Sequence, residues 1–464
     1  MSFEVGTRLN EGSYPGDGGA GGALGRTGVI HTPHGDIRTP AFIPVGTKAT
    51  VKAVLPESVR ALGAQAVLAN AYHLYLQPGS EILDAAGGLA AFMNWPGPTF
   101  TDSGGFQVMS LGSGIKKVLS EEFSGKALAS GSMNDSAQRD GRSGQGGRVP
   151  VSTSRDGVGL SDAGAPAAPE SSVTPPKRHN GSLTKVDDDG VWFRSHLDGS
   201  RHRFSPEVSM RIQHEIGADI IFAFDELTTL LDSRQYQEEA LERTRRWAER
   251  CLRAHRRLTD ERSGKPYQML MGVIQGAQYE DLRRKAARDL GAMEIDGQRF
   301  DGFGIGGALE KENLGRIVRW VNEELPEQAP KHLLGISEPD DLFAGIENGA
   351  DTFDCVNPSR VARNAAIYTP DGRFNVTRRE CRTDFGPLVP GCACYTCTHY
   401  SRAYLHHAFK AKEMIAATLA TIHNEHFTVH LVDSIREAIE DGHYWEFKAE
   451  YLGRYYAAGG RLAL

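Results

Sequence analysis

The chain of 464 residues lacks several features that define other classes of protein. It contains no run of about 18 apolar residues, so we expect no segment to cross a membrane. Residues 1–26 hold no apolar core of the kind found in secretory signals, so we expect a flexible leader and a cytoplasmic protein. Positive charge is not in excess, since 52 Lys and Arg face 59 Asp and Glu and the net charge is −7. Any contact with nucleic acid must therefore come from a local basic patch.

Cysteine is scarce but unevenly placed. Four of the six cysteines fall within 17 positions, and Cys392, Cys394 and Cys397 form a Cys-x-Cys-x2-Cys cluster. In a reduced chain, clustered cysteines indicate a metal site more often than disulfides. Three thiolates need a fourth ligand, and a closed tetrahedral shell of thiolates and imidazole suits Zn²⁺. With four protein ligands the ion would be structural, because no position stays open for a substrate.

The fourth ligand of this site is open at this point. His423 follows Cys397 after 25 residues, just past a helix predicted over Arg402–Ile422 that could return it to the cysteine loop. Its rivals lie nearby in the sequence: Cys381, His399, His406, His407 and His426. The segment Phe427–Ala458 is also predicted to be helical. We therefore expect residues 381–464 to form a zinc-binding, helical C-terminal module.

Residues 27–380 alternate between short apolar runs and segments with helical patterning. Eight runs are predicted as buried strands, over residues 41–47, 66–70, 98–102, 219–226, 269–276, 301–307, 331–337 and 351–356. Helices are expected over 56–62, 206–216, 237–258, 280–290, 313–324 and 340–348. Strands that alternate with helices form parallel sheets with right-handed crossovers. Eight such units predict an α/β fold of the (β/α)8 TIM-barrel type, with a doubly wound open sheet as the alternative.

One stretch interrupts this alternation. Residues 113–185 are rich in Ser, Gly, Asp and Pro and poor in large apolar side chains. Such a segment cannot bury enough surface to offset the entropy of ordering it, so we expect a disordered insertion after the third strand. Its basic residues could contact RNA, although a solvated loop without function is the simpler interpretation: Arg139, Arg142, Arg148, Lys177 and Arg178.

Polar residues follow several of the predicted strands, where the reactive groups of TIM barrels lie. This rule selects Asp102, Asp225–Glu226, Gln275, Gly306–Gly307 and Asp354. Two carboxylates at one barrel mouth, Asp102 and Asp354, fit retaining glycosidic-bond chemistry, in which one attacks the sugar and the other transfers a proton. The remaining polar groups could hydrogen-bond a purine edge, and Phe106 could stack on its ring. Taken singly, a strand-end Asp is more often a helix cap than a catalytic group.

Together these segments resemble the tRNA-guanine transglycosylases, also called queuine tRNA-ribosyltransferases, of the bacterial type. The matching motifs occur in order from about Thr27 to Tyr455: TDSGGFQVMSL, FDE, VIQG, GIGG, FDCVNPSRVARN and C-x-C-x2-C-x25-H. The resemblance implies a zinc-bearing (β/α)8 barrel that acts as a homodimer on tRNA, without a redox cofactor. It implies exchange of the wobble guanine of GUN anticodons for a 7-deazaguanine base, either prequeuosine base or queuine.

The resemblance also implies a role for each matching residue. Asp354 matches the nucleophile and Asp102 the general acid/base. The groups that match the base-binding pocket are Asp225, Gln275, Gly306 and Gly307, with Phe106 and Leu334 on the two sides of the purine. Arg360 and Arg363 match side chains that hold neighbouring anticodon nucleotides. The residues that match the zinc ligands are Cys392, Cys394, Cys397 and His423, and the spacing rejects Cys381.

Three positions depart from the pattern of the family. Leu227 follows Glu226 where bacterial members usually carry cysteine, and the loop after Gly307 reads ALEKE where small or apolar residues are usual. Glu338 stands where a basic residue often faces RNA. The first two border the predicted base pocket, so they bear on which base enters. Two other hypotheses are a non-catalytic tRNA-binding subunit, against which the retained Asp102 and Asp354 argue, and a relative that modifies DNA.

Overall fold

The computed structural model describes residues 1–9, 22–112, 184–262, 264–307 and 310–457. Its centre is a sheet of eight parallel strands: β4 (Ala41–Pro44), β5 (Val67–Ala69), β6 (Thr99–Thr101), β10 (Ile220–Phe222), β11 (Met269–Ile274), β12 (Gly302–Ile305), β13 (Lys331–Leu333) and β14 (Thr352–Cys355). From β5 to β14, each strand of this sheet pairs with the next barrel strand along the chain, and β14 pairs with β4. A parallel bridge between Val45 and Leu68 joins its two edges. The sheet is therefore the predicted (β/α)8 barrel, and all eight predicted strands are present.

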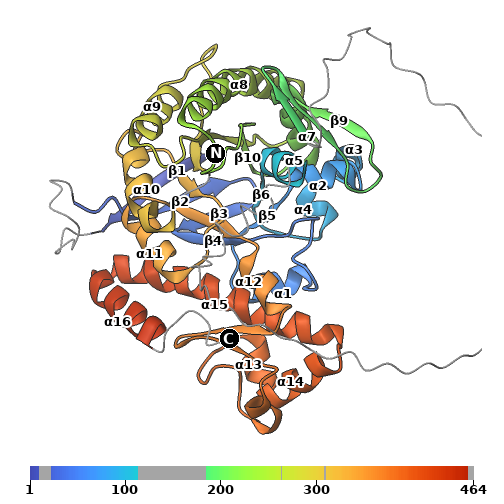
Figure 1. Cartoon of the computed structure of the whole chain (residues 1–464), viewed down its shortest axis with the longest axis vertical. Helices are drawn as coiled ribbons and strands as arrows, with labels where there is room; N and C mark the ends of the chain where they lie inside the picture. The colour runs from blue at the N-terminus through green and yellow to red at the C-terminus, as the bar shows by residue number, and fades with distance from the viewer. Residues whose placement is uncertain (10–21, 113–183, 263, 308–309, 458–464) are drawn as a thin grey trace, which may run out of the picture. The chain divides into compact units, whose positions relative to one another are not determined.

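Helices lie around this barrel (Figure 1). The main ones are α1 (Pro56–Ala61), α2 (Ala71–Leu76), α3 (Ser80–Ala85), α4 (Leu89–Phe92), α5 (Gly105–Gly112), α7 (Pro206–Ile216), α8 (Arg234–Glu261), α9 (Glu280–Gly291), α10 (Leu314–Asn322) and α11 (Pro339–Glu347). The sequence sets the limits of α7 clearly. The Ser205 side chain caps its first turn by accepting from the backbone N–H of Val208, and Gly217 ends it in the left-handed conformation.

The N-terminal segment differs from the expected flexible leader. Residues Ser2–Arg8 form β1, which pairs with β2 (Arg26–Thr32), and β2 pairs with β3 (Gly35–Thr39). Ile30 and Ile37 belong to the apolar cluster inside the barrel, and the buried Arg26 makes two hydrogen bonds to Asp351 at 2.8–2.9 Å. The prediction was wrong here because the partner strand of β1 lies about 20 residues away. Residues 10–21 lie outside the described part.

A second small sheet lies between β6 and α7 in the chain. It consists of β7 (Thr184–Asp187), β8 (Gly190–Arg194) and β9 (Arg201–Phe204), all antiparallel. Its buried side chains, among them Val191, Phe193 and Phe204, face the body of the protein. The expected insertion at 113–185 lies outside the described residues except for the first two residues of β7.

After β14 the chain builds a smaller unit and then returns to the barrel. The unit contains α12 (Asn357–Ala362), β15 (Ala366–Thr369), β16 (Gly372–Asn375), α13 (Tyr395–His399) and α14 (Arg402–Lys410). The long α15 (Met414–Glu440) packs against α12, β15, α13 and α14 and also against β4 and α11, and α16 (Tyr444–Ala457) follows it. Among the described residues, no helix is long and apolar enough to cross a membrane.

The single helix predicted over Arg402–Ile422 is instead two helices. The chain turns after Lys410, where Lys412 takes a positive φ of 58° and the N–H of Glu413 donates to the carbonyl of Ala408. This left-handed turn ends α14 and starts α15 in a new direction. His423 therefore lies within the long helix α15, whereas the prediction placed it just past the end of a helix.

Candidate active site and metal centre

Asp102 follows β6 directly, and three donors hold its carboxylate. Oδ1 accepts from the backbone N–H of Ala71 at 2.8 Å, and Oδ2 accepts from the side-chain amides of Gln107, at 2.8 Å, and of Asn70. Burial raises the pKa of Asp102 to about 6 in spite of these hydrogen bonds, and the charge of Asp354 adds to the rise. A carboxyl group with this pKa can donate and accept a proton near neutral pH.

Asp354 lies in β14, at the same end of the barrel. Its Oδ1 accepts from the backbone N–H of Gly335 at 3.0 Å and contacts Nε2 of His332 at 3.1 Å. His332 is fully buried inside the barrel, and its Nδ1 lies 2.8 Å from the hydroxyl of Thr352. Both contacts hold one oxygen and fix the plane of the carboxylate. The side chain of Asp354 is 13% exposed, and its Oδ2 accepts no hydrogen bond from the described residues.

The two carboxylates thus form an electrostatically coupled pair. Burial is the largest cause of the raised pKa of Asp102, and the charge of Asp354 adds to the rise. Asp354 is held through a single oxygen. Asp102 is buried and can change its protonation state near neutral pH. This is the division of labour that a retaining transfer at a sugar carbon needs.

Asp225 and Gln275 meet beside this pair. Oδ2 of Asp225 accepts from the Gln275 amide at 2.6 Å, and Oδ1 accepts from the hydroxyl of Ser103 at 3.4 Å. Burial raises the pKa of Asp225 to about 6, and the charge of Asp102 contributes to the rise. Oε1 of Gln275 is buried without a hydrogen-bond partner among the described residues. The group therefore has unused hydrogen-bonding capacity inside the mouth.

The turn Gly306–Gly307 follows β12 and lies against Gln275. Gly307 has a φ of +90°, and a Cβ there would overlap Oε1 of Gln275. A Cβ on Gly306 would come within 3.2 Å of Leu334 Cδ1 and 3.3 Å of Gln275 Nε2. The fully buried guanidinium of Arg283 ties the two strand ends together through the carbonyls of Ile274 and Gly306 at 2.9 and 2.8 Å. Four of the predicted pocket residues therefore meet: Gln275, Gly306, Gly307 and Leu334.

The other predicted contact residues are more open. Phe106, at the start of α5, is 42% exposed. Arg360 in α12 is exposed, and its guanidinium makes no hydrogen bond to the described residues. Arg363 is half-buried and donates to the carbonyl of Ser359 at 2.9 Å, and burial lowers the pKa of its guanidinium. Among the described residues, no hydrogen bond or ion pair joins these three side chains to the carboxylate pair, so their roles stay predictions.

The cysteine cluster meets His423, as the resemblance implied. The ligand atoms of Cys392, Cys394, Cys397 and His423 all lie within 4.8 Å of one another. Nδ1 of His423 is 3.3 Å from the sulfur of Cys397 and 3.4 Å from that of Cys394, while Nε2 lies 2.8 Å from the carbonyl of Tyr368. That contact assigns the ring proton to Nε2 and leaves Nδ1 free to bind a metal. Among the described residues, no other group of His, Cys, Asp and Glu has this arrangement.

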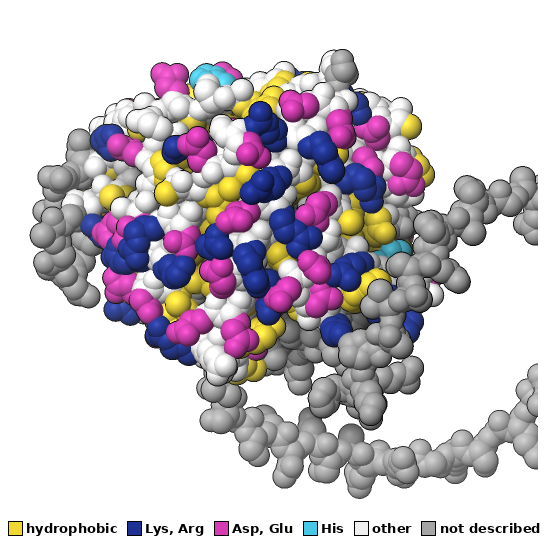
Figure 2. Space-filling view, turned by 90° about the horizontal axis from the view of Figure 1, so that it is seen from above, with side chains coloured by type: hydrophobic (Ala, Val, Ile, Leu, Met, Phe, Trp, Pro, Cys, Tyr) yellow, Lys and Arg dark blue, Asp and Glu magenta, His cyan; other side chains and the backbone are white. Residues whose placement is uncertain are grey.

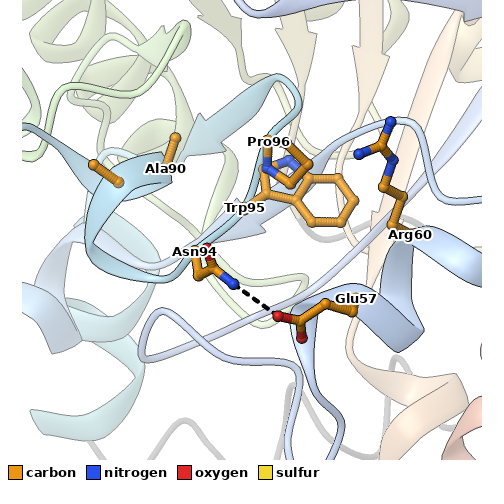
Figure 3. Close-up of a pocket in the computed structure, with 7 residues that line it drawn as sticks. Glu57, Arg60, Ala90, Asn94, Trp95 and Pro96 are labelled. Carbon is orange, nitrogen blue, oxygen red and sulfur yellow. Dashed lines mark hydrogen bonds between the residues drawn. The ribbon is translucent and has the colours of Figure 1, made fainter.

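A pocket elsewhere on the surface has no comparable chemistry (Figure 3). It lies between α1 and α4 with the segment that follows α4, and it is lined by Glu57, Arg60, Ala90, Ala91, Asn94, Trp95 and Pro96. Its carboxylate, Glu57, accepts from the Asn94 amide at 2.7 Å, and the indole of Trp95 donates to the carbonyl of Pro98. The Glu57 carboxylate and the Trp95 indole therefore each have a hydrogen-bond partner within the protein.

Comparison with known proteins agrees with the geometry. The model of the queuine tRNA-ribosyltransferase family matches residues 21–137 and 170–457. The chain belongs to this family. Two curated relatives named queuine tRNA-ribosyltransferase come from Caldanaerobacter subterraneus subsp. tengcongensis and Thermoanaerobacter pseudethanolicus. They are 39% and 40% identical over 93% of this chain and 94% of their own length. The unmatched residues 138–169 fall within the expected insertion.

The structure places two of the residues at which this queuine tRNA-ribosyltransferase family member departs from the family pattern. Leu227 is half-buried and packs against the main core. Glu338 accepts two hydrogen bonds from Arg373, both at 2.6 Å, so its charge is paired within the protein.

Sequence reasoning missed several residues that support this site. Asn70 ends a predicted strand, so the strand-end rule could have selected it, and Gln107 lies in the TDSGGFQ motif. His332 and Arg283 had no such signal. Each is buried within a strand or helix, and these partners lie 9 to 23 residues away, outside its own element.

Proposed function

We propose that the protein exchanges the wobble guanine of tRNAs with GUN anticodons, those for Asp, Asn, His and Tyr, for a 7-deazaguanine base in queuosine biosynthesis. The incoming base would be prequeuosine base or queuine. The observation that carries the proposal is the coupled pair Asp102 and Asp354 at the mouth of a barrel whose sequence belongs to this family.

In this mechanism the free oxygen of Asp354 attacks C1′ of the wobble ribose, and the bond from C1′ to N9 of guanine breaks. Asp102 gives its proton to the leaving guanine. The ribose is then held on Asp354 as an ester. The incoming base attacks C1′ through N9, loses a proton to Asp102 and displaces Asp354, which recovers its charge.

The coupling of the two carboxylates supports this order of events. Before attack, the negative charge of Asp354 raises the pKa of Asp102 and favours its acid form. Once Asp354 is esterified it carries no charge, so this contribution vanishes. After the proton has left with guanine, the lower pKa then favours the carboxylate form of Asp102. That form is the base that the second half of the exchange requires.

Base recognition is assigned to the groups that meet beside the pair. The carboxylate of Asp225 can accept from the N–H groups of a guanine edge, and the N–H of Gly307 can donate to its carbonyl oxygen. The Gln275 side chain has a free oxygen, and its amide can rotate, so it can either donate to or accept from the base. Phe106 and Leu334 would cover the two faces of the ring, and Arg360 and Arg363 would hold the neighbouring nucleotides.

The metal site is assigned a structural role. Three thiolates and one imidazole fill a tetrahedral shell and suit Zn²⁺, which would fix the loop Cys392–Cys397 to α15. We further propose that the enzyme is a cytoplasmic homodimer, which the resemblance implies and light scattering after gel filtration can test.

Exchange of labelled guanine into purified GUN tRNA tests the function. We expect incorporation by the wild type and none by Asp354→Ala, while that variant still binds tRNA. Incorporation by Asp354→Ala would overturn the assignment of the nucleophile. A wild type that labels a matched DNA instead of tRNA, or only binds tRNA, would favour one of the two other hypotheses.

A further inference from the structure

The outer face of the β7–β9 sheet carries an unusual group of side chains. Because side chains alternate along each strand, the register places Lys185, Trp192, Arg194, Arg201 and Arg203 on the side opposite to the buried Val191 and Phe193. Lys185, Arg194 and Arg201 are exposed. We call these five residues the basic sheet face. One carboxylate, Asp187, lies among its four cations and pairs with Arg203 at 2.9 Å.

Trp192 organises two of these cations. The guanidinium carbons of Arg201 and Arg203 lie 4.3 and 5.0 Å from the centre of its ring. A cation held against an aromatic ring keeps its full charge but loses rotational freedom. The planar guanidinium groups are thus pre-organised, and such groups bind phosphate through two parallel N–H donors.

The sheet adjoins the proposed active site. Its inner face packs against Tyr72 of α2, whose ring centre lies 5.4 Å from that of Phe193, and α5 packs against β7 and β8. Both helices begin just after residues of the site: α2 follows Asn70 directly, and α5 begins at Gly105, three positions after Asp102. The sheet therefore packs on two helices that begin at the proposed active site.

The surface over α8 and α9 offers a contrast. Figure 2, seen from the side of α8 and α9, shows Lys and Arg interspersed with Asp and Glu. Many of these charges are paired along the helices, as in Arg234–Glu238, Arg245–Glu249 and Arg284–Glu280. For a chain with a net charge of −7, a face with four cations and one carboxylate is the kind of local patch that binding to nucleic acid requires.

We propose that the basic sheet face binds the phosphate backbone of the substrate tRNA, outside the base pocket. The inference rests on the proposed function for the identity of the nucleic acid. The face supplies charge and position but no sequence recognition, because its donors match phosphates and not a particular base.

The test is a double variant, Arg194→Ala with Arg201→Ala, in the full chain, assayed with full-length GUN tRNA at several salt concentrations. We expect KM for tRNA and the dissociation constant to rise about tenfold at low salt. The slope of log Kd against log salt should fall by about 2, because two phosphate contacts are lost. The matched control removes two exposed arginines of α8, Arg253→Ala with Arg257→Ala, and should leave both quantities unchanged.

Two single variants separate pre-organisation from charge. Trp192→Ala should raise KM several-fold although it removes no charge, while Trp192→Tyr should stay near the wild type. Unchanged affinity and salt slope in the double variant would overturn the proposal, and this is also the result expected if the face bound an acidic protein instead. Equal losses of affinity in the α8 control would overturn it as well. If the wild type binds tRNA but exchanges no guanine, the proposed function fails, and the binding assay still decides about this face.

Discussion

His332 holds one oxygen of Asp354 from inside the barrel, with Nε2 3.1 Å from Oδ1. On the other side of the imidazole, Nδ1 lies 2.8 Å from the hydroxyl of Thr352. With the proton on Nε2, the ring donates to Asp354 and accepts from Thr352. A residue with no contact to the outside thus fixes the orientation of the proposed nucleophile.

His332→Phe should therefore reduce kcat for guanine exchange about 10- to 100-fold, as loss of a residue that orients a reactive group does. The rings of Phe100 and Phe222 already border the site, so a phenyl ring can be accommodated. Affinity for tRNA should not change. Thr352→Val, which removes only the outer hydrogen bond, should cost less. A His332→Phe enzyme with wild-type kcat would show that Asp354 needs no such support.

Asp225→Asn should stabilise the protein at pH 8 but not at pH 4. Burial raises the pKa of Asp225 to about 6, so between pH 4 and 6 the folded state retains a proton that the unfolded state releases. Stability is lost as pH rises through this window, by about 2–3 kcal/mol in the free energy of unfolding. Asparagine does not ionise and avoids this loss, and the Gln275 amide can rotate to hydrogen-bond with the new side chain.

Urea unfolding of both proteins at the two pH values measures the difference. An equal gain or loss at pH 4 and pH 8 would contradict the raised pKa. Guanine exchange should fall in the same variant, because a carboxylate that accepts from the base is lost.

Gly307→Ala should impair binding of the base more than it impairs folding. Gly307 has a φ of +90°, and its Cβ would overlap Oε1 of Gln275. Gly297 is a matched control, since its φ is +77° and a Cβ there meets nothing within 4 Å. Both substitutions should cost about 1 kcal/mol of stability through backbone strain. Only Gly307→Ala should raise KM for the incoming base, by about tenfold or more, and equal KM values in the two variants would refute the pocket assignment.

Loss of the metal should weaken the barrel as well as the small unit beyond β14. His423 lies in α15, and this helix also packs against β4 and α11. Cys394→Ser should lose the bound zinc and lower the unfolding midpoint by about 5–10 °C, because binding energy at such sites is folding energy. Cys381→Ser should keep one zinc per chain, since Cys381 is buried in the same cluster but is not among the ligands. Zinc content by mass spectrometry and thermal unfolding decide between these outcomes.

The eight barrel strands could be predicted because each is a short apolar run that ends in polar or small residues, and α7 because Ser205, Pro206 and Gly217 mark its limits. The first strand could not, because its pairing with β2 spans residues 10–21 and its own pattern is mostly polar. The turn at Lys412 rests on a left-handed residue that the sequence does not announce. The role of His332 could not be predicted for a related reason, because its partner, Asp354, lies on the next strand of the barrel.

The residues of the site also differ in whether the sequence could predict them. Groups at strand ends, such as Asp102 and Gln275, follow from topology. The residues that support the site from within a strand or a helix, such as His332 and Arg283, depend on which elements meet in space. Spacing alone left several rivals for the fourth metal ligand, and the geometry brings only His423 to the three cysteines.

The most direct test of the central claim is to find the ribose on Asp354. Wild-type enzyme would be mixed with a GUN anticodon stem–loop, quenched in acid, digested and examined by mass spectrometry. We expect a peptide containing Asp354 that carries the RNA minus guanine, and no such peptide from Asp354→Asn. An adduct on Asp102, or guanine exchange without any adduct in rapidly quenched samples, would contradict the proposed division of roles between the two carboxylates.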